Sequence, residues 1–157
     1  MIKTEQGFFI SIRGDKEKVR VLEIALDYVP AVVVNALRDR LAILTMTHRP
    51  GIRLSRPLCE TCEVVFLSEE RFPRVGGMPH ETDSRFFIFL VLHEVAHAYL
   101  KHKCPYFDKL SEEEVVKNED EATAKAIEWF NLHVSVNQQL GQKVMNDLEI
   151  KTFEANC

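Results

Sequence analysis

An unbroken apolar run, Phe86 to Leu92, leads directly into the pentapeptide HEVAH at positions 93–97. Because the run leaves no polar face, a helix built from it must be buried on most of its sides. The run is far shorter than the roughly 18–20 residues that span a bilayer, so we expect no membrane contact. This central helix should run to about Lys103, before a proline, and begin at one of three capping residues: Thr82, Asp83 or Ser84.

The pentapeptide places two imidazoles and a carboxylate inside this apolar helix, where unpaired polar groups are costly. His93 and His97 are four positions apart, which on a helix separates them by roughly 40° and about 6 Å along the axis. Both can therefore reach one Zn²⁺ at about 2.0–2.1 Å. Glu94 is suitably placed to take the proton from a water that the metal activates. The alternative is a buried polar network without a metal.

Two histidines need a further protein ligand, and a downstream carboxylate is one common solution. Ser111 and Glu114 have the spacing of a capping box, which predicts a second helix that continues to about Val134. By helical phase, Glu119 lies near the middle of the apolar stripe, and we predict it as the third ligand. Glu121, about 160° away from it, is the next candidate. The residues within about 80° of Glu119 are Val115, Val116, Ala122, Thr123, Ala126, Ile127, Phe130 and Val134.

Other polar residues near the motif are weaker candidates. His102 follows His97 by five positions, so on a continuing helix it points about 140° away and is expected to be a supporting or surface residue. His133 lies about 21 Å from Glu119 along a straight helix, too far for the same site. A peptidase also needs a donor for the oxyanion of the scissile carbonyl. The candidates, by residue type only, are His80, Tyr99 and Tyr106.

The remaining chain predicts an α+β fold with helices and short strands before the two long helices. No repeat or linker divides the sequence, so we expect one domain over 1–157 with a motif core at about 62–135. Proline and glycine mark two loops, at 49–57 and 72–79. The expected strands are Phe8–Ile12, Leu41–Thr47 and Glu63–Leu67, and the expected helices are Lys16–Tyr28, Ala31–Arg40 and a weaker one at Asn137–Ile150.

Composition excludes several classes of protein. With 20 basic and 24 acidic residues the net charge is −4, so we expect no nucleic-acid partner. Four cysteines are too few for a disulfide-stapled fold, and the Cys59–Cys62 pair lacks the second pair of a zinc ribbon. The N-terminus lacks a basic region followed by an apolar one, so we expect no Sec export. Reduced thiols in a cytoplasmic protein are the expected state.

The motif residues resemble the gluzincin pattern, HExxH followed by a downstream ExxA. His93 to His97 match the first part, and Glu119 to Ala122 match the second. The run from Ala98 to His102 resembles ImmA/IrrE-type metallopeptidases, and the order of elements is similar to small zincins of the lethal-factor type. The resemblance covers about residues 62–130. It implies a zincin fold, a small twisted sheet over the motif helix, with substrate bound along an edge strand that we expect at Glu63–Leu67.

Three positions depart from these patterns. Thr123 occupies the position where many gluzincins have an aspartate that supports a histidine, which predicts weaker support here. Ala96 replaces a glycine that often precedes the second histidine, a tolerable change on a helix. Lys103 stands where metzincins have a third histidine, so that subclass is excluded.

Together these patterns predict a zinc metallopeptidase that acts on a protein or peptide substrate. His93, His97 and Glu119 would hold Zn²⁺, and Glu94 would act as general base and then as general acid. One alternative is a zincin-fold binding or regulatory domain with a structural or vestigial zinc site. The intact Glu94 counts against it, because a structural site has no use for a base. A non-peptide amide hydrolase with the same site is a third interpretation.

Overall fold

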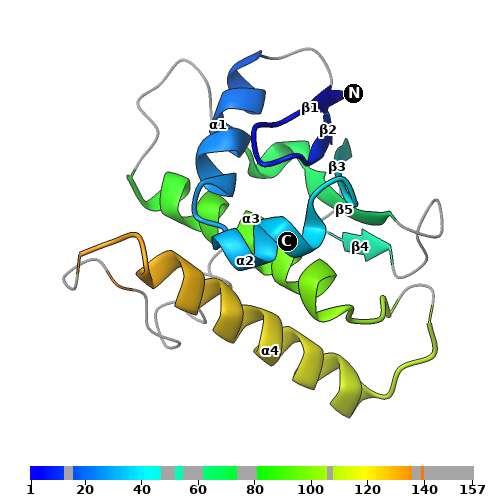
Figure 1. Cartoon of the computed structure of the whole chain (residues 1–157). Helices are drawn as coiled ribbons and strands as arrows, with labels where there is room; N and C mark the ends of the chain where they lie inside the picture. Colours follow the sequence, from blue (N-terminus) through cyan, green and yellow to red (C-terminus); the bar gives the residue numbers. More distant parts are fainter. Residues whose placement is uncertain are drawn as a thin grey trace.

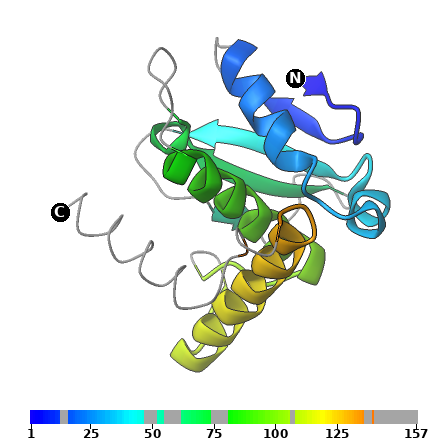
Figure 2. The same cartoon turned by 90° about the vertical axis from the view of Figure 1, so that its left-hand side faces the viewer.

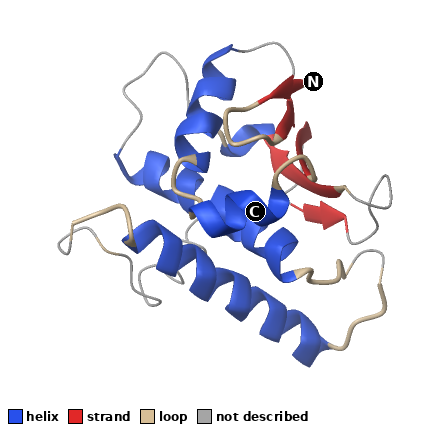
Figure 3. Cartoon of the chain, viewed as in Figure 1, coloured by secondary structure: helices blue, strands red, loops and turns tan. Residues whose placement is uncertain are grey.

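The computed structural model describes residues 1–12, 16–46, 52–54, 62–73, 81–105, 108–135 and 139. Within them the chain is α+β, with four α-helices and one five-stranded mixed sheet (Figures 1 and 3). The helices are α1 (Lys16–Leu26), α2 (Ala31–Leu37), α3 (Glu81–Leu100) and α4 (Glu112–Asn131). The strands are β1 (Ile2–Lys3), β2 (Phe9–Ser11), β3 (Leu41–Met46), β4 (Ile52–Leu54) and β5 (Glu63–Ser68). A short 3₁₀ turn, Glu69–Arg71, follows β5.

The sheet has the order β1-β2-β3-β5-β4. Strands β2, β3 and β5 run parallel, with Ile43 paired to Ile10 on one side and to Val65 on the other. The two outer strands, β1 and β4, run antiparallel to their neighbours. The sequence-based choice of Glu63–Leu67 as the edge strand is therefore wrong, because β5 is paired on both sides. Its near-continuous burial, with Val64, Val65 and Leu67 all covered, is typical of an interior parallel strand.

The hairpin between β1 and β2 depends on a glycine. Gly7 has a φ of +85°, a conformation that residues with a Cβ adopt only with strain. A Cβ at Gly7 would also lie 2.9 Å from Cγ of Arg38. The turn closes through Gly7 N–H, which donates to the Thr4 carbonyl at 2.9 Å. Two independent constraints thus fix glycine at this position.

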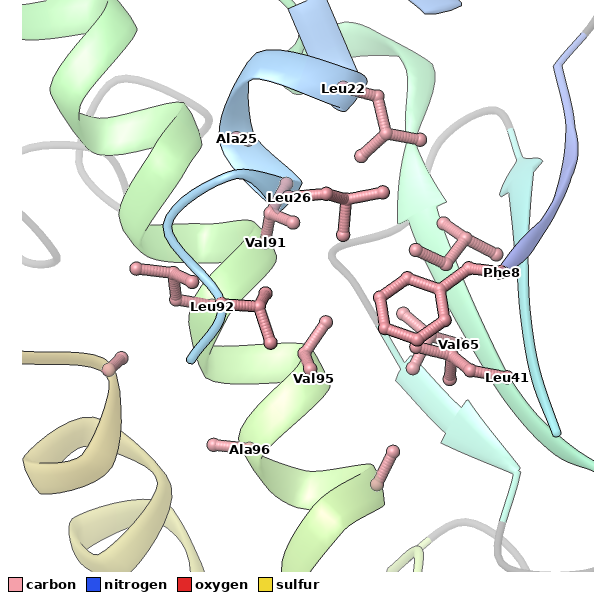
Figure 4. Packing of buried hydrophobic residues seen from close by; sticks show 14 of the residues in the cluster. Phe8, Leu22, Ala25, Leu26, Leu41, Val65, Val91, Leu92, Val95 and Ala96 are labelled. Carbon is pink, nitrogen blue, oxygen red and sulfur yellow. The ribbon is translucent and has the colours of Figure 1, made fainter. Parts of the chain in front are cut away.

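Helix α3 is the centre of the molecule, as its continuous apolar sequence predicts. It contacts α1, α2, α4 and strands β4 and β5. Figure 2 shows α1 and α3 side by side along the sheet, with α4 beyond α3. In Figure 4, Leu26 of α1 and Val95 of α3 approach Phe8 and the strand residue Val65, whereas Ala96 points toward α4. Each of these five residues is at most 1% exposed.

Helix α4 begins where the sequence predicts. Ser111 caps it by accepting a hydrogen bond from Glu114 N–H at 3.2 Å, and the Glu114 carboxylate accepts one from Ser111 N–H at 2.9 Å. The reciprocal pair is a capping box. Small residues on its inner face, Ala122 and Ala126, are fully buried and let α4 lie close to α3. The helix ends at Asn131, three residues before the expected end.

The other element boundaries agree only in part with those predicted from the local sequence. The predicted helices at Lys16 and Ala31 are present but end earlier, and the predicted strand at Leu41 is present. Helix α3 begins at Glu81, so the expected capping residues Thr82, Asp83 and Ser84 lie inside it. The loop predicted at 49–57 contains the short strand β4. The helix predicted at Asn137–Ile150 lies, except for Gln139, outside the described residues.

No helix among the described residues is both long and apolar enough to cross a membrane. Most of the buried apolar side chains of these residues form one core cluster, to which the sheet and all four helices contribute. This core packs against α3 from several sides. The packing therefore fixes the position of residues 93–97 of that helix, which carry the two histidines and Glu94.

Candidate metal centre

Three predicted ligands meet at the interface of α3 and α4. His93 Nε2 lies 3.0 Å from His97 Nε2 and 3.1 Å from Glu119 Oε2, and His97 Nε2 lies 3.5 Å from Glu119 Oε1. The two histidines lie one turn apart on α3, and Glu119 comes from α4, which crosses beside them. Each of the three offers a ligand atom within 4.8 Å of the others.

This donor set fits a divalent metal such as zinc. The ligands of a tetrahedral zinc, at about 2.0–2.2 Å, lie roughly 3.3 Å from one another, and the three separations above bracket that value. Two imidazole nitrogens and one carboxylate oxygen are also a donor set that zinc accepts. Without a cation, the 3.0 Å approach of His93 Nε2 and His97 Nε2 requires a proton on at least one of them, whereas a cation would bind the lone pairs of both nitrogens at once.

The exposure of Glu119 differs from its predicted burial. His93 and His97 are 7% and 9% exposed, but the Glu119 side chain is 52% exposed. Val116, expected on the same buried stripe, is 60% exposed. Helical phase gave the direction of Glu119 correctly, whereas the first half of α4 is not covered as its apolar pattern suggests. The centre is consequently buried on the α3 side and open toward solvent at the carboxylate.

The ionisation of His97 and Glu119 favours cation binding. Burial lowers the pKa of His97, so its neutral, metal-binding form dominates at pH 7. Burial acts to raise the pKa of Glu119, but its hydrogen bonds with His93 and His97 outweigh that effect and hold the pKa well below its usual range. The centre thus presents a neutral imidazole at His97 and a carboxylate anion at Glu119.

Glu94, the predicted base, is 6% exposed and lies on α3 between the two histidines. Burial raises its pKa to about 7, with the charge of Glu119 adding to the increase and that of His93 opposing it. A buried carboxyl group with a pKa near neutrality, beside a group of metal ligands, is the pattern expected of a proton-transfer residue.

His93 has a second contact on the side away from the centre. Its Nδ1 lies 3.3 Å from Oγ1 of Thr123, which is itself 6% exposed. If Nε2 were bound to a metal, the proton of the neutral His93 ring would be on Nδ1 and could be donated to that hydroxyl oxygen. Thr123 therefore offers the His93 ring a neutral hydroxyl partner.

His102 lies close to the centre, in contrast to the 140° that a continuing helix implies. Helix α3 stops at Leu100 instead of Lys103, because Lys101 adopts a left-handed φ of 58°. His102 N–H then donates to the His97 carbonyl at 3.0 Å, and Lys101 N–H to the Ala98 carbonyl at 3.3 Å. These two bonds define a Schellman motif, which folds His102 back beside His97. A glycine after Leu100 would have signalled this turn, but the sequence has lysine.

The fold-back gives His102 two polar contacts. Its Nδ1 lies 2.9 Å from Nδ1 of His97, and its Nε2 lies 3.1 Å from Oε2 of Glu121 on α4. The ring is only 8% exposed. Glu121, the second candidate for third ligand, is thus beside His102, and it is Glu119 that contacts His93 and His97. The expectation that His102 is a supporting or surface residue rather than a ligand agrees with these contacts.

The remaining candidates lie elsewhere or outside the described residues. Tyr99 packs against Trp129 at a ring-centroid distance of 6.0 Å, and His133 packs against Tyr28 at 5.1 Å. Cys104 is a buried thiol and Cys62 a half-buried one. The other residues that sequence analysis singled out here, His80, Tyr106 and Cys59, lie outside the described residues.

No protein-family model, curated protein or solved structure matches the chain. The assignment of a function therefore depends on the geometry and chemistry of the residues themselves.

Proposed function

We propose that this chain is a zinc-dependent metallopeptidase with the centre described above. The observation that carries the proposal is the convergence of His93 Nε2, His97 Nε2 and a Glu119 oxygen at separations of 3.0–3.5 Å, with the buried Glu94 carboxyl on the same helix. Of these residues, three would hold the ion and one would transfer protons. When bound, the ion supplies a Lewis acid that acidifies a water and polarises a carbonyl group.

Glu94 is the residue that would move the proton. It would take a proton from the attacking water onto its carboxylate and return that proton to the nitrogen of the leaving amine. A pKa near 7 suits a group that must both accept and release a proton at neutral pH. Burial of this carboxyl group is hard to reconcile with a purely structural site, because such a site gains nothing from a base.

The sheet offers a place for an extended peptide. Strand β4 is the outer strand of the described sheet next to β5, and it contacts α3, the helix that carries the histidines. The outward backbone groups of an edge strand can pair with an extended chain by strand addition. We therefore assign substrate binding to β4, in place of the interior strand β5. A peptide added there would run along the sheet edge beside α3.

We also propose the class of partner and the cellular location. The partner is a protein or peptide substrate, and the net negative charge argues against nucleic acid. A cytoplasmic location is consistent with the thiols of Cys62 and Cys104, which form no disulfide.

Elemental analysis of purified wild type, Glu119→Ala and Asp120→Ala tests the metal centre. Asp120 is an exposed carboxylate at the next position of α4 and serves as the matched control. We expect about one zinc per chain in the wild type and in Asp120→Ala, and a large loss in Glu119→Ala. A wild type without metal after zinc is supplied would refute the proposal.

Cleavage of a diverse peptide library tests the chemistry, with Glu94→Gln as the comparison. We expect this variant to retain zinc and to lose cleavage by a factor of at least about 10², the typical contribution of a general base. Undiminished cleavage in Glu94→Gln would remove Glu94 from the mechanism. A zinc-loaded wild type that cleaves no peptide in the library would favour the binding or regulatory domain instead.

A further inference from the structure

The residues behind His97 form a connected path that the metallopeptidase proposal does not use. His102 lies between the Nδ1 side of His97 and the Glu121 carboxylate, at 2.9 Å and 3.1 Å respectively. The path begins at a buried ring, crosses a second buried ring and ends on a side chain that is 47% exposed. The other Glu121 oxygen lies 3.8 Å from Nζ of the exposed Lys117.

The ligand role of His97 fixes the direction of every proton in this path. With Nε2 of His97 engaged as a ligand, the proton of its neutral ring is on Nδ1, and that N–H donates to Nδ1 of His102. His102 therefore accepts at Nδ1 and carries its own proton on Nε2. That N–H donates to Glu121, whose carboxylate can only accept.

We propose that His102 and Glu121 are positioning residues that hold His97 in its metal-binding tautomer through a directed chain of hydrogen bonds. This inference rests on the proposed metal centre. The chain fixes the rotation of the His97 ring and its proton position, and the anionic end makes Nε2 of His97 a stronger electron donor. The two ligating histidines thus receive unequal support: His93 from the neutral hydroxyl of Thr123, and His97 from a carboxylate reached through His102.

The positions of His102 and Glu121 also bear on Thr123, which stands where the resembled pattern has an aspartate. In the described part of the chain, Nδ1 of His93 contacts the Thr123 hydroxyl, whereas a carboxylate stands behind the other histidine. Both acceptors come from α4, as does Glu119, and their positions on that helix are 119, 121 and 123. One helix therefore supplies the third ligand and the support for both histidines.

Zinc affinity, measured by competition with a chromophoric chelator, tests the chain. Glu121→Gln keeps an oxygen that can accept from His102 but removes the charge, and His102→Phe fills the same space without the hydrogen bonds. We expect losses in affinity of about tenfold and of about 10–100-fold, respectively. Asp120→Asn removes the same charge from an exposed neighbouring position and should remain within twofold of wild type.

Ring nitrogen NMR of the metal-loaded chain supplies a readout that a merely structural role would not move. We expect His97 protonated on Nδ1 and His102 protonated on Nε2. If His102→Phe fails to fold, the half-exposed Glu121→Gln still decides the question. Tight zinc binding by the wild type, with both variants within twofold of it or with His102 protonated on Nδ1, would overturn this inference and leave the metal centre intact. A wild type that binds no zinc would overturn both.

Discussion

Glu94 illustrates a conflict between stability and chemistry at a single residue. A carboxyl group at 6% exposure loses most of its hydration, and burial moves its pKa from 4.5 to about 7. In the absence of a cation, ionising this group at higher pH opposes folding. The residue that suits proton transfer is therefore also one that destabilises the metal-free fold.

Metal-free Glu94→Gln should gain stability relative to wild type as pH rises. The folded wild type keeps the Glu94 proton up to pH of about 7, whereas the unfolded chain releases it near 4.5. The folded state thus binds more protons between these values, so its stability falls as pH increases through that window. The full difference corresponds to about 3 kcal/mol at pH 8.

Chemical denaturation of both proteins with a chelator, between about pH 5 and pH 8, measures this effect. The pKa shifts of His97 and Glu119 are present in both proteins, so their main contributions cancel in the difference, and what remains includes the coupling of Glu94 with the charges of His93 and Glu119. Parallel pH profiles for wild type and Glu94→Gln would show that burial of this carboxyl group has no such consequence.

At the scale of elements, the contact of α3 with α4 determines whether the ligands meet. Ala122 and Ala126 are fully buried on the inner face of α4, and Glu119 lies on the same helix one or two turns earlier. Small side chains let the two helix axes approach closely, which brings the Glu119 carboxylate within reach of His93 and His97. The proposed metal centre thus depends on the spacing between α3 and α4.

Ala126→Leu should separate the helices and weaken the centre. Three additional carbon atoms in a closely packed interface typically cost 1–3 kcal/mol through overpacking. We expect a loss of about that size in unfolding free energy, together with lower zinc affinity. Ala124→Leu, on the exposed side of the same helix, should change neither by more than about 0.5 kcal/mol. Equal effects of the two substitutions would contradict this role for Ala126.

Elements with strong local signals could be predicted from the sequence, and those set by their neighbours could not. The capping box at Ser111 and the apolar run before His93 are local, and both helices were found from them. Strands β1 and β4 have two and three residues, too few for an alternating pattern, and are defined by pairing with β2 and β5.

The candidate site divides in the same way. Spacing on one helix predicts that His93 and His97 share a face, and phase on the next helix selects Glu119 over Glu121. The approach of His102 could not be predicted, because it depends on a left-handed lysine at position 101 where glycine is usual. The exposure of Glu119 depends on how much of α4 is covered by the rest of the protein, and helical phase alone cannot predict that.

At the scale of the whole molecule, one ion would link two helices that are separate in sequence. The unfolded chain cannot hold its three ligands together without closing the loop between them, so the ion should bind the folded state far better. Metal binding is then coupled to global stability.

Zinc at about 100 times its dissociation constant should raise the unfolding free energy by about 2.7 kcal/mol. Denaturant titrations with buffered zinc and with chelator provide the comparison. Glu119→Ala should lose most of the increase, and Asp120→Ala should keep it. If zinc leaves the wild-type midpoint unchanged, the folded and unfolded chains bind it equally, which a preformed centre excludes.

The division of the ligands between α3 and α4 also sets an order of events in biosynthesis. His93 and Glu119 are 26 positions apart, so a growing chain presents the two imidazoles well before the carboxylate has been made. Until α4 is complete, the nascent chain would offer the two imidazoles of the proposed centre, and Glu94, without the Glu119 carboxylate. Loading of the proposed centre would therefore follow the synthesis and docking of α4, and a chain truncated before α4 would lack the Glu119 carboxylate.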